Sequence, residues 1–428
     1  MITGARVRKR QILAALALTN LVSYAARNAL FSVVKPLEQQ FSIDDAQVGL
    51  LQTVFMLSHA LATLPFGWAG DRYDRRRVIL VGILVASFAG AAGALGHSYW
   101  GLAVSRGLVG LGTAAVVPIA NSILGEIFDG PSKASRMSIF NLGLFLGGVA
   151  GFAAGSAVGF PTVVLVVAVP GIALAGWLAA LPVPLRPEPP PSSSLYGTLA
   201  PFVGRFIAAA RSLLRIRTLR WVMISTTAMA FATGGLAAWL KEFLTREKGL
   251  SPHEADLLLA LGLGGGVAGV LAGGRIADRL RRTRVNGRLW AIALGMALTI
   301  PCAVLSIRLP NAPALYAVGV ATLFFISWYH APMAASVDDL APDGHSSTAQ
   351  SLVIFTMHMV GTAPASWVLG EVSKHRNLTL AMWVPIFAIA VAALAMAIAT
   401  RSFAADHARA RARAGAPASA GAAPAGPL

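Results

Sequence analysis

The chain has 428 residues, of which 56% are hydrophobic and only 12% are charged, and its mean hydropathy is +0.67. Soluble domains carry about 25% charged residues, so this composition excludes a soluble globular protein and indicates a multi-pass membrane protein. The net charge of +17 does not predict a nucleic-acid partner, because the basic residues are dispersed among loops, and the single cysteine, Cys302, excludes a disulfide framework.

The first predicted span runs from Gln11 to Val34 and follows a charged start, Met1 to Arg10. No small-residue cleavage pattern follows it, so we expect a transmembrane helix rather than a removed signal peptide. Counting apolar runs of about 20 residues gives about twelve spans, the last near Asn377 to Ala399. The sequence therefore predicts an all-α membrane protein with twelve transmembrane helices.

Arg27 lies about sixteen residues into the first span, too deep to reach either headgroup layer easily. Burying an arginine near the bilayer centre costs roughly 2.5 to 3.5 kcal/mol, and such residues usually face a cavity. Because no Asp or Glu lies deep in any predicted span, we expect Arg27 to bind an anionic substrate, with Tyr24 and Asn28 beside it. The alternative is that Arg27 caps the backbone carbonyls of a broken helix.

A basic hairpin, Gly67 to Arg77, joins the second and third predicted spans, Val48 to Phe66 and Val78 to Leu95. The positive-inside rule places its four arginines on the cytoplasmic side. A second copy, Gly273 to Arg282, follows about two hundred residues later, as expected of a transporter built from two repeats. The gating candidates from these two motifs are Gly67, Asp71, Arg72, Arg75, Asp278 and Arg279.

Small residues mark three further spans. Arg106 opens the fourth span as Arg106-Gly-x-x-Gly110-x-Gly112, where it has either a gating role or snorkels to the outer interface. Glycines recur from 143 to 151 in the fifth span and from 262 to 274 in the eighth. Such patterns permit either tight helix packing alone or an interface that slides.

A Pro-rich stretch and the basic amphipathic stretch Arg205 to Arg215 separate the two halves of the chain. The first favours an extended linker, and the second predicts a helix that lies on the inner membrane surface. We therefore expect a six-helix bundle over 1–182, a cytoplasmic linker over 183–218, a second six-helix bundle over 219–401 and a disordered cytoplasmic tail over 402–428.

Lys and Arg gather in alternate loops, and both termini lie on the basic side. By the positive-inside rule, both termini are expected in the cytoplasm and the protein in the inner cell membrane. The loop Asp338 to His345 on that side is acidic, but acids carry little weight in the rule. The eleventh span should begin at the same face, which makes its positive helix end available to Asp71.

His330 and His358 are the groups that we expect to titrate near neutral pH inside the spans, either as relays or as packing hydrogen-bonders. No constellation of nucleophile, base and metal is visible, so we expect no enzyme, no cofactor and no metal site. The other cavity candidates are polar or amphipathic residues of the spans: Thr113, Asn121, Asn141, Trp239 and Tyr329.

The hairpin Gly67 to Arg77 resembles the loop between the second and third helices of the major facilitator superfamily, written G-x-L-A-D-R-x-G-R-R, and departs from it at Asp74. The Arg106 motif resembles a second superfamily motif. The resemblance implies two pseudo-symmetric six-helix bundles around a central cavity. It also implies that the contact between Asp71 and the eleventh span locks the cytoplasmic side in the outward-open state.

Further stretches are similar to the spinster branch of this superfamily, lipid carriers that move lysophospholipids or sphingosine phosphates. The likeness covers the first span with Arg27, then 41–55, 231–239 and 347–364. The family usually has an acid before the first-span arginine, where this chain has Ala26, and a Glu in the fourth span, where it has Thr113. These departures remove the family's expected proton-sensing pair.

We predict a monomeric secondary transporter that works by alternating access. Its substrate would be an amphiphilic anion such as a lysophospholipid or a phosphorylated sphingolipid, and its other partners membrane lipids. One alternative is an organophosphate or organic-anion exchanger, because an arginine without a neighbouring acid in the first span also resembles the pattern of organophosphate:phosphate antiporters. Another alternative is a multidrug efflux carrier. A non-transporting membrane sensor is the alternative of a different class, and a membrane enzyme comes third.

Overall fold

The computed structural model describes residues 2–43, 45–96, 98–128, 130–181, 204, 207–310, 313–342 and 344–415. The Pro-rich part of the linker and the tail from 416 onward lie outside the described residues. All the regular elements of the described part are helices. This follows from the composition, because an apolar chain in hydrocarbon must satisfy its backbone hydrogen bonds within each segment.

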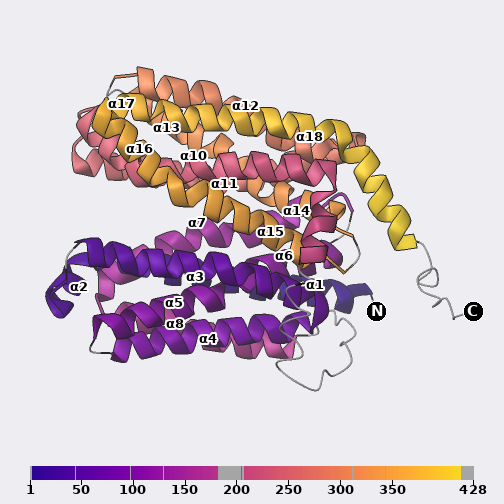
Figure 1. Cartoon of the computed structure of the whole chain (residues 1–428), viewed down its shortest axis with the longest axis horizontal. Coiled ribbons are helices and arrows are strands. Elements are labelled where there is room, and N and C mark those ends of the chain that lie inside the picture. Colours follow the sequence, from indigo (N-terminus) through magenta and orange to yellow (C-terminus); the bar gives the residue numbers. More distant parts are fainter. Residues whose placement is uncertain are drawn as a thin grey trace, which may run out of the picture.

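The first half of the chain forms one bundle (Figure 1). Its elements are α1 (Ile2–Asn28), η1 (Ala29–Ser32), α2 (Val34–Phe41), α3 (Asp45–Arg72), α4 (Arg75–Leu95), α5 (Tyr99–Thr113), α6 (Val116–Ile127), α7 (Lys133–Val158) and α8 (Thr162–Ala180).

The second half forms the other bundle. Its elements are α10 (Arg217–Arg246), α11 (Pro252–Thr283), α12 (Gly287–Arg308), α13 (Pro313–Ile326), η2 (Ser327–Tyr329), α14 (His330–Leu340), α15 (Ser346–Thr356), η3 (Met357–Thr362), α16 (Ala363–His375), α17 (Leu378–Ala381) and α18 (Trp383–Gly415).

Eleven helical stretches in the described part of the chain are long and apolar enough to cross a membrane. The first predicted span is not among them, because α1 carries Asn20, Arg27 and Asn28 within its apolar run. α1 nevertheless lies alongside α7 over much of its length, inside the first bundle. With it, the twelve predicted spans are all present as helical columns in the described residues.

The two bundles lie side by side with their helices nearly parallel, and the start of α1 and the end of α18 lie at the same end of the molecule (Figure 1). We call this the termini end. Between the halves, α3 packs against α15, α7 against α11 and α14 against α7. The second span therefore meets the eleventh, and the fifth meets the eighth.

Four spanning columns are interrupted part-way along. α1 ends at Asn28, α5 gives way to α6 after Thr113, the tenth span breaks at η2, and the eleventh contains the π-helix η3. Pro118, Pro332 and Pro364 follow three of these interruptions. A proline lacks the N–H that would bond the carbonyl four residues earlier, which accounts for these three breaks.

The glycines of the fifth span pack α7 against α1 within one half. A Cβ added at Gly143, Gly147 or Gly151 would lie 2.7, 2.2 or 2.3 Å from a backbone atom of α1. In the eighth span, Gly269 and Gly273 similarly approach carbonyls of α13 and η2. These glycines therefore serve close packing inside a half.

Other glycines of the eighth span face the opposite half. An added Cβ at Gly266 would lie 2.8 Å from the Phe145 ring, and one at Gly274 would lie 3.0 Å from the Ala134 carbonyl. The glycines thus permit close packing inside each half and close approach between the halves.

Two predicted boundaries are wrong. The first span does not run unbroken to Val34, because the helix ends at Asn28 and the chain turns through η1 into α2. The tail is not disordered from residue 402, since α18 continues to Gly415. Asp406 accepts hydrogen bonds from the Thr218 N–H and hydroxyl, and Phe403 is buried, so tertiary contacts hold this segment.

Candidate functional site

The predicted site residues gather at the interruptions of the helices. Arg27 lies in the last turn of α1, Thr113 at the end of α5, Tyr329 and His330 at the η2 break, and His358 in η3. Transporter sites commonly form at such discontinuous helices near the bilayer centre. The breaks belong to both halves, so the candidates approach one another from both sides of the interface.

Arg27 makes no hydrogen bond or ion pair through its guanidinium with any described residue. The guanidinium carbon lies 5.8 Å from the centroid of the Tyr24 ring. The side chain is partly exposed. A cation without an acidic partner is what the sequence predicts here, and it leaves the five N–H donors of Arg27 available to an anion.

The alternative role proposed for Arg27, capping the carbonyls of a broken helix, belongs to Arg106. Its guanidinium donates to the Ala26 carbonyl at 2.9 Å, the Arg27 carbonyl at 3.3 Å and the Gln52 side-chain oxygen at 3.3 Å. Arg106 is 5% exposed and lies 4.7 Å from the Phe55 ring centroid. The snorkelling alternative is therefore wrong, and Arg106 fixes the end of α1 that carries Arg27.

His59 is a site residue that the sequence analysis missed. Its Nδ1 lies 3.2 Å from the Gly110 carbonyl and 3.1 Å from the Thr113 hydroxyl. A carbonyl oxygen only accepts, so Nδ1 carries the proton. The Thr113 hydroxyl donates to the Val109 carbonyl and accepts from His59. The signal was present as a lone histidine in the run Val48 to Phe66.

His59 touches the other half through His358. The two rings lie 5.8 Å apart, nearly perpendicular to each other. Nδ1 of His358 is buried and has no hydrogen-bond partner among the described residues. Arg27 is close enough to interact electrostatically with both imidazoles. One guanidinium and two imidazoles therefore come together from α1, α3 and η3, and π-helical turns such as η3 are frequent at functional sites.

A second ring cluster crosses the interface beside it. Tyr329 stacks on His330 with ring centroids 4.1 Å apart, and the His330 ring meets Phe145 of α7 at 5.7 Å. These contacts place the predicted residues of the η2 break at the interface with α7.

The other candidates have local partners. Asn28 and Asn141 each donate to the carbonyl four residues earlier in their own helix. Trp239 donates to the Ser366 carbonyl at 3.0 Å and packs α10 against α16, within the second half. Asn121 is buried, and its side-chain oxygen has no hydrogen-bond partner in the part of the chain that the structure describes. The structure thus does not bring Trp239 to the cluster around Arg27.

At the termini end, Asp71 caps a helix of the other half. Its two carboxylate oxygens accept from the backbone N–H groups of Ser347 at 2.9 Å and Thr348 at 2.7 Å. A Cβ at Gly67 would lie 2.7 Å from the Ser347 carbonyl, so the close approach requires glycine. The first turn of α15 therefore meets Asp71 as the sequence predicts, and the positive helix end favours the carboxylate.

The second copy of the motif forms the mirrored contact. Asp278 accepts from the N–H groups of Ala134 at 3.2 Å and Ser135 at 2.7 Å, at the start of α7 in the first half. Arg288 bonds to Asp278 at 3.4 Å and to Asp339 at 2.5 Å. Each half thus supplies a carboxylate that caps a helix of the other.

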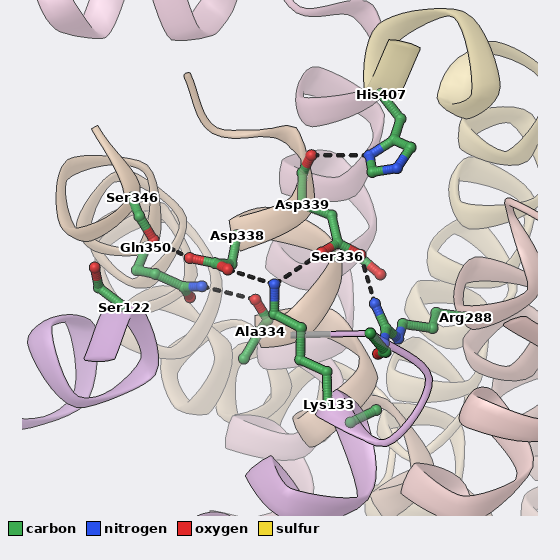
Figure 2. Close-up of polar contacts among 12 residues, drawn as sticks. Ser122, Lys133, Arg288, Ala334, Ser336, Asp338, Asp339, Ser346, Gln350 and His407 are labelled. Carbon is green, nitrogen blue, oxygen red and sulfur yellow. Dashed lines mark hydrogen bonds and ion pairs between the residues drawn. The ribbon is translucent and has the colours of Figure 1, made fainter. Parts of the chain in front are cut away.

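Lys133 joins the same network, as Figure 2 shows. Its ammonium lies between Asp338, at 2.5 Å, and Asp339, at 2.8 Å, although the side chain is 3% exposed. The Asp339 carbonyl accepts from His407 of α18. The acidic loop Asp338 to His345 therefore supplies the two carboxylates that pair with Lys133.

The arginines of the two motifs are placed differently. Arg75 is fully buried and pairs with Glu126 at 2.6 Å, inside the first half. The Arg72 guanidinium lies over the Trp68 ring at 5.2 Å. Arg279 is exposed and makes no polar contact with the described residues. Asp74, where the hairpin departs from the family pattern, accepts from the Arg76 N–H and caps α4.

Comparisons with known proteins agree with this architecture. The family model described as Major Facilitator Superfamily matches residues 16–366 and again 222–427. Protein spinster homolog 3 of Danio rerio is 30% identical over 380 residues, which cover 84% of this chain and 76% of that protein.

Solved structures with the same fold include two transporters. The first is a bacterial homologue of the human lysosomal transporter Spinster in an inward-facing, unoccupied conformation, with a TM-score of 0.59, 21% identity and coverage of 93% of this chain and 98% of that one. The second is the human organic anion transporter MFSD10, with a TM-score of 0.76, 14% identity and coverage of 91% and 99%.

Proposed function

The chain belongs to the Major Facilitator Superfamily as a multi-pass transporter of the spinster type, and from this premise we propose that it carries an amphiphilic anion by alternating access. Membership in this superfamily argues against the alternative of a membrane enzyme, because the related proteins are transporters. The proposed substrate is a lysophospholipid, a phosphorylated sphingolipid or another single-chain amphiphile with an anionic head group.

The observation that carries the proposal is the guanidinium of Arg27. It has no acidic partner among the described residues, and it lies beside His59 and His358 at the contact between the halves. A positive site without a carboxylate favours an anion and repels the hydrophobic cations of multidrug efflux. The spinster resemblance supports the amphiphilic part of the assignment.

The contacts at the termini end support alternating access. Asp71 and Asp278 cap helices of opposite halves, and Lys133 pairs across the same interface. These contacts join opposite halves and are polar, so they can form and break as the halves move relative to each other. By the positive-inside rule this end is proposed to face the cytoplasm of an inner membrane, so the closed end corresponds to an outward-facing carrier.

The central test is transport by Arg27→Ala in proteoliposomes, with a fluorescent lysophosphatidylglycerol as the probe. Removal of the guanidinium should lower initial uptake at least tenfold, because the anionic head group loses its partner. Arg10→Ala is the matched control, since Arg10 is an exposed arginine of the same helix. It should leave uptake unchanged. Uptake by Arg27→Ala equal to that of the parent would overturn the assignment.

Organic-anion exchange is the second candidate, because a lone guanidinium also suits a small anion. The same vesicles can be loaded with a short-chain phosphate ester in place of the lipid. Exchange of the short ester with no lipid uptake would select this second function. No movement of either probe, with the protein folded, would favour the non-transporting sensor.

A further inference from the structure

A groove of about 620 Å³ runs along the side of the second bundle, between α10, η3 and α18. Its walls include Ile224 and Phe231 of α10, Val360 of η3 and Val391 of α18. Val360 is 61% exposed, as expected of a side chain that faces lipid in a membrane-spanning protein. The groove is separate from the cluster around Arg27, which lies between the halves.

The end of this groove nearest the termini end is basic. Arg220 lines it and is exposed, and Arg211, Arg215 and Arg217 lie exposed in the preceding turns. None of these four arginines pairs with a carboxylate of the described residues, and no acidic side chain lines the groove. Basic pockets between spanning helices are typical sites for anionic head groups.

The helical residues 207–214 bring this charge to the groove. Leu213 is fully buried and anchors the segment, while Leu214 lines the groove itself. The sequence predicts a basic amphipathic helix here that lies at the membrane surface. The segment therefore holds its arginines at headgroup depth, where they meet the end of the groove.

The length of the groove matches one leaflet. Arg220 and Phe231 line its two ends along α10, and eleven residues of helix rise about 16 Å. Half of the hydrocarbon core of a bilayer is about 15 Å thick. An acyl chain that starts from a head group at Arg220 would thus reach the bilayer centre at Phe231.

We propose that this groove is a binding site for an anionic phospholipid of the leaflet at the termini end. The phosphate contacts Arg220, and one acyl chain lies along α10 against Ile224 and Phe231. A zwitterionic lipid carries an ammonium that the basic cluster repels, so the site selects a net anionic head group. The bound chain also touches Val360, in the π-helical turn that carries His358.

The test counts bound lipid by native mass spectrometry, with the full chain in detergent and either phosphatidylglycerol or phosphatidylcholine added. Retention of phosphatidylglycerol should exceed that of phosphatidylcholine, and Arg220→Gln should lower it about fivefold, as expected for the loss of one charge near the surface. Arg284→Gln, an exposed arginine away from the groove, is the charge control and should retain the parent's binding.

Groove-filling variants test the acyl chain separately. Val391→Trp should block binding, whereas Leu394→Trp, on the same helix and 63% exposed but outside the groove, should not. Ile224→Trp serves if Val391→Trp fails to fold. Equal retention of the two lipids, or unchanged binding in Arg220→Gln and the filled variants, would overturn the proposal. Because the readout is bound lipid, the result is independent of transport through Arg27.

Discussion

Lys133 is a charged residue that the fold buries at the contact between the two halves. It begins α7, is 3% exposed, and places its ammonium between two carboxylates of the other half. A buried charge that loses its partner costs far more than an exposed one, because water cannot replace the missing contact. The contact between the two halves at the termini end should therefore depend on this side chain.

We expect Lys133→Ala to shift the protein away from the closed termini end, because it leaves Asp338 without its cation and Asp339 with Arg288 alone. Breaking a buried pair costs about 3 to 5 kcal/mol. The measurement is the distance between spin labels at Tyr73→Cys and Arg284→Cys, in a Cys302→Ser background.

The matched control is Lys241→Ala, because the Lys241 and Asp256 side chains are 48% and 58% exposed. An exposed pair contributes about 0.2 to 1 kcal/mol, so the distance distribution should not change. A closed end that persists in Lys133→Ala would show that Arg288 and the two helix caps suffice without Lys133.

Arg27 and Arg106 show how alike two arginines look in a sequence and how differently a fold uses them. Both lie inside apolar spans without an acid nearby in the chain. Arg106 reaches three oxygens of α1 and α3, whereas the guanidinium of Arg27 has no such partner in the described residues. The buried arginine thus positions the one that is available to an anion.

At the scale of elements, the interrupted helices and the glycine-lined contacts decide the shape of the site. The sequence predicts the spans well because each is a local run of apolar residues. It does not predict that α1 ends at Asn28, since no proline marks that break. The break is stabilised by Arg106, a residue of another helix.

The contact of α7 with α1 gives a prediction at this scale. Gly147→Ala should destabilise the first bundle by about 1 to 3 kcal/mol, because the added Cβ would lie 2.2 Å from the Leu21 carbonyl and the two helices would have to move apart. The effect is measured as the melting temperature in detergent, with size-exclusion chromatography used to count the protein that remains folded after heating.

Gly176→Ala in α8 is the control, since nothing lies within 4 Å of its added Cβ. Glycine in a helix is less stable than alanine by roughly 0.5 to 1 kcal/mol, so this variant should melt at the same or a higher temperature. Equal melting of the two variants would contradict the packing described for α1 and α7.

For the whole molecule, the two motif copies act as reciprocal caps. Asp71 of the first half holds α15 of the second, and Asp278 of the second half holds α7 of the first. Arg288 connects Asp278 to the Lys133 network of Figure 2, because it pairs with both Asp278 and Asp339. The closed end is therefore held at several places.

We expect Asp71→Asn and Asp278→Asn each to raise the population of molecules whose two halves are separated at the termini end. The double variant should raise this population further. Asparagine keeps one acceptor oxygen, but its NH₂ group cannot accept from the second backbone N–H, and the charge that the positive helix end favours is lost, which costs about 0.3 to 1 kcal/mol. Each of these contacts acts only while the halves are joined. The same pair of spin labels reports the separation.

Asp74→Asn provides the comparison, because Asp74 caps α4 within its own half. It should lower thermal stability without changing the distance between the halves. If Asp71→Asn and Asp278→Asn behaved like Asp74→Asn, the reciprocal caps would not hold the two halves together.

The sequence alone predicted the membrane class, the approximate spans, the two halves and the paired motifs. It also predicted a cation, Arg27, deep in the first span without an acid near it. These depend on hydropathy, charge and repetition, which are properties of short stretches. Only the tertiary structure revealed His59 beside His358, Lys133 between Asp338 and Asp339, and the helical segment 402–415. The pairings join residues far apart in the chain, and the segment 402–415 is held by the contact of Asp406 with Thr218. All three features therefore depend on how the helices pack.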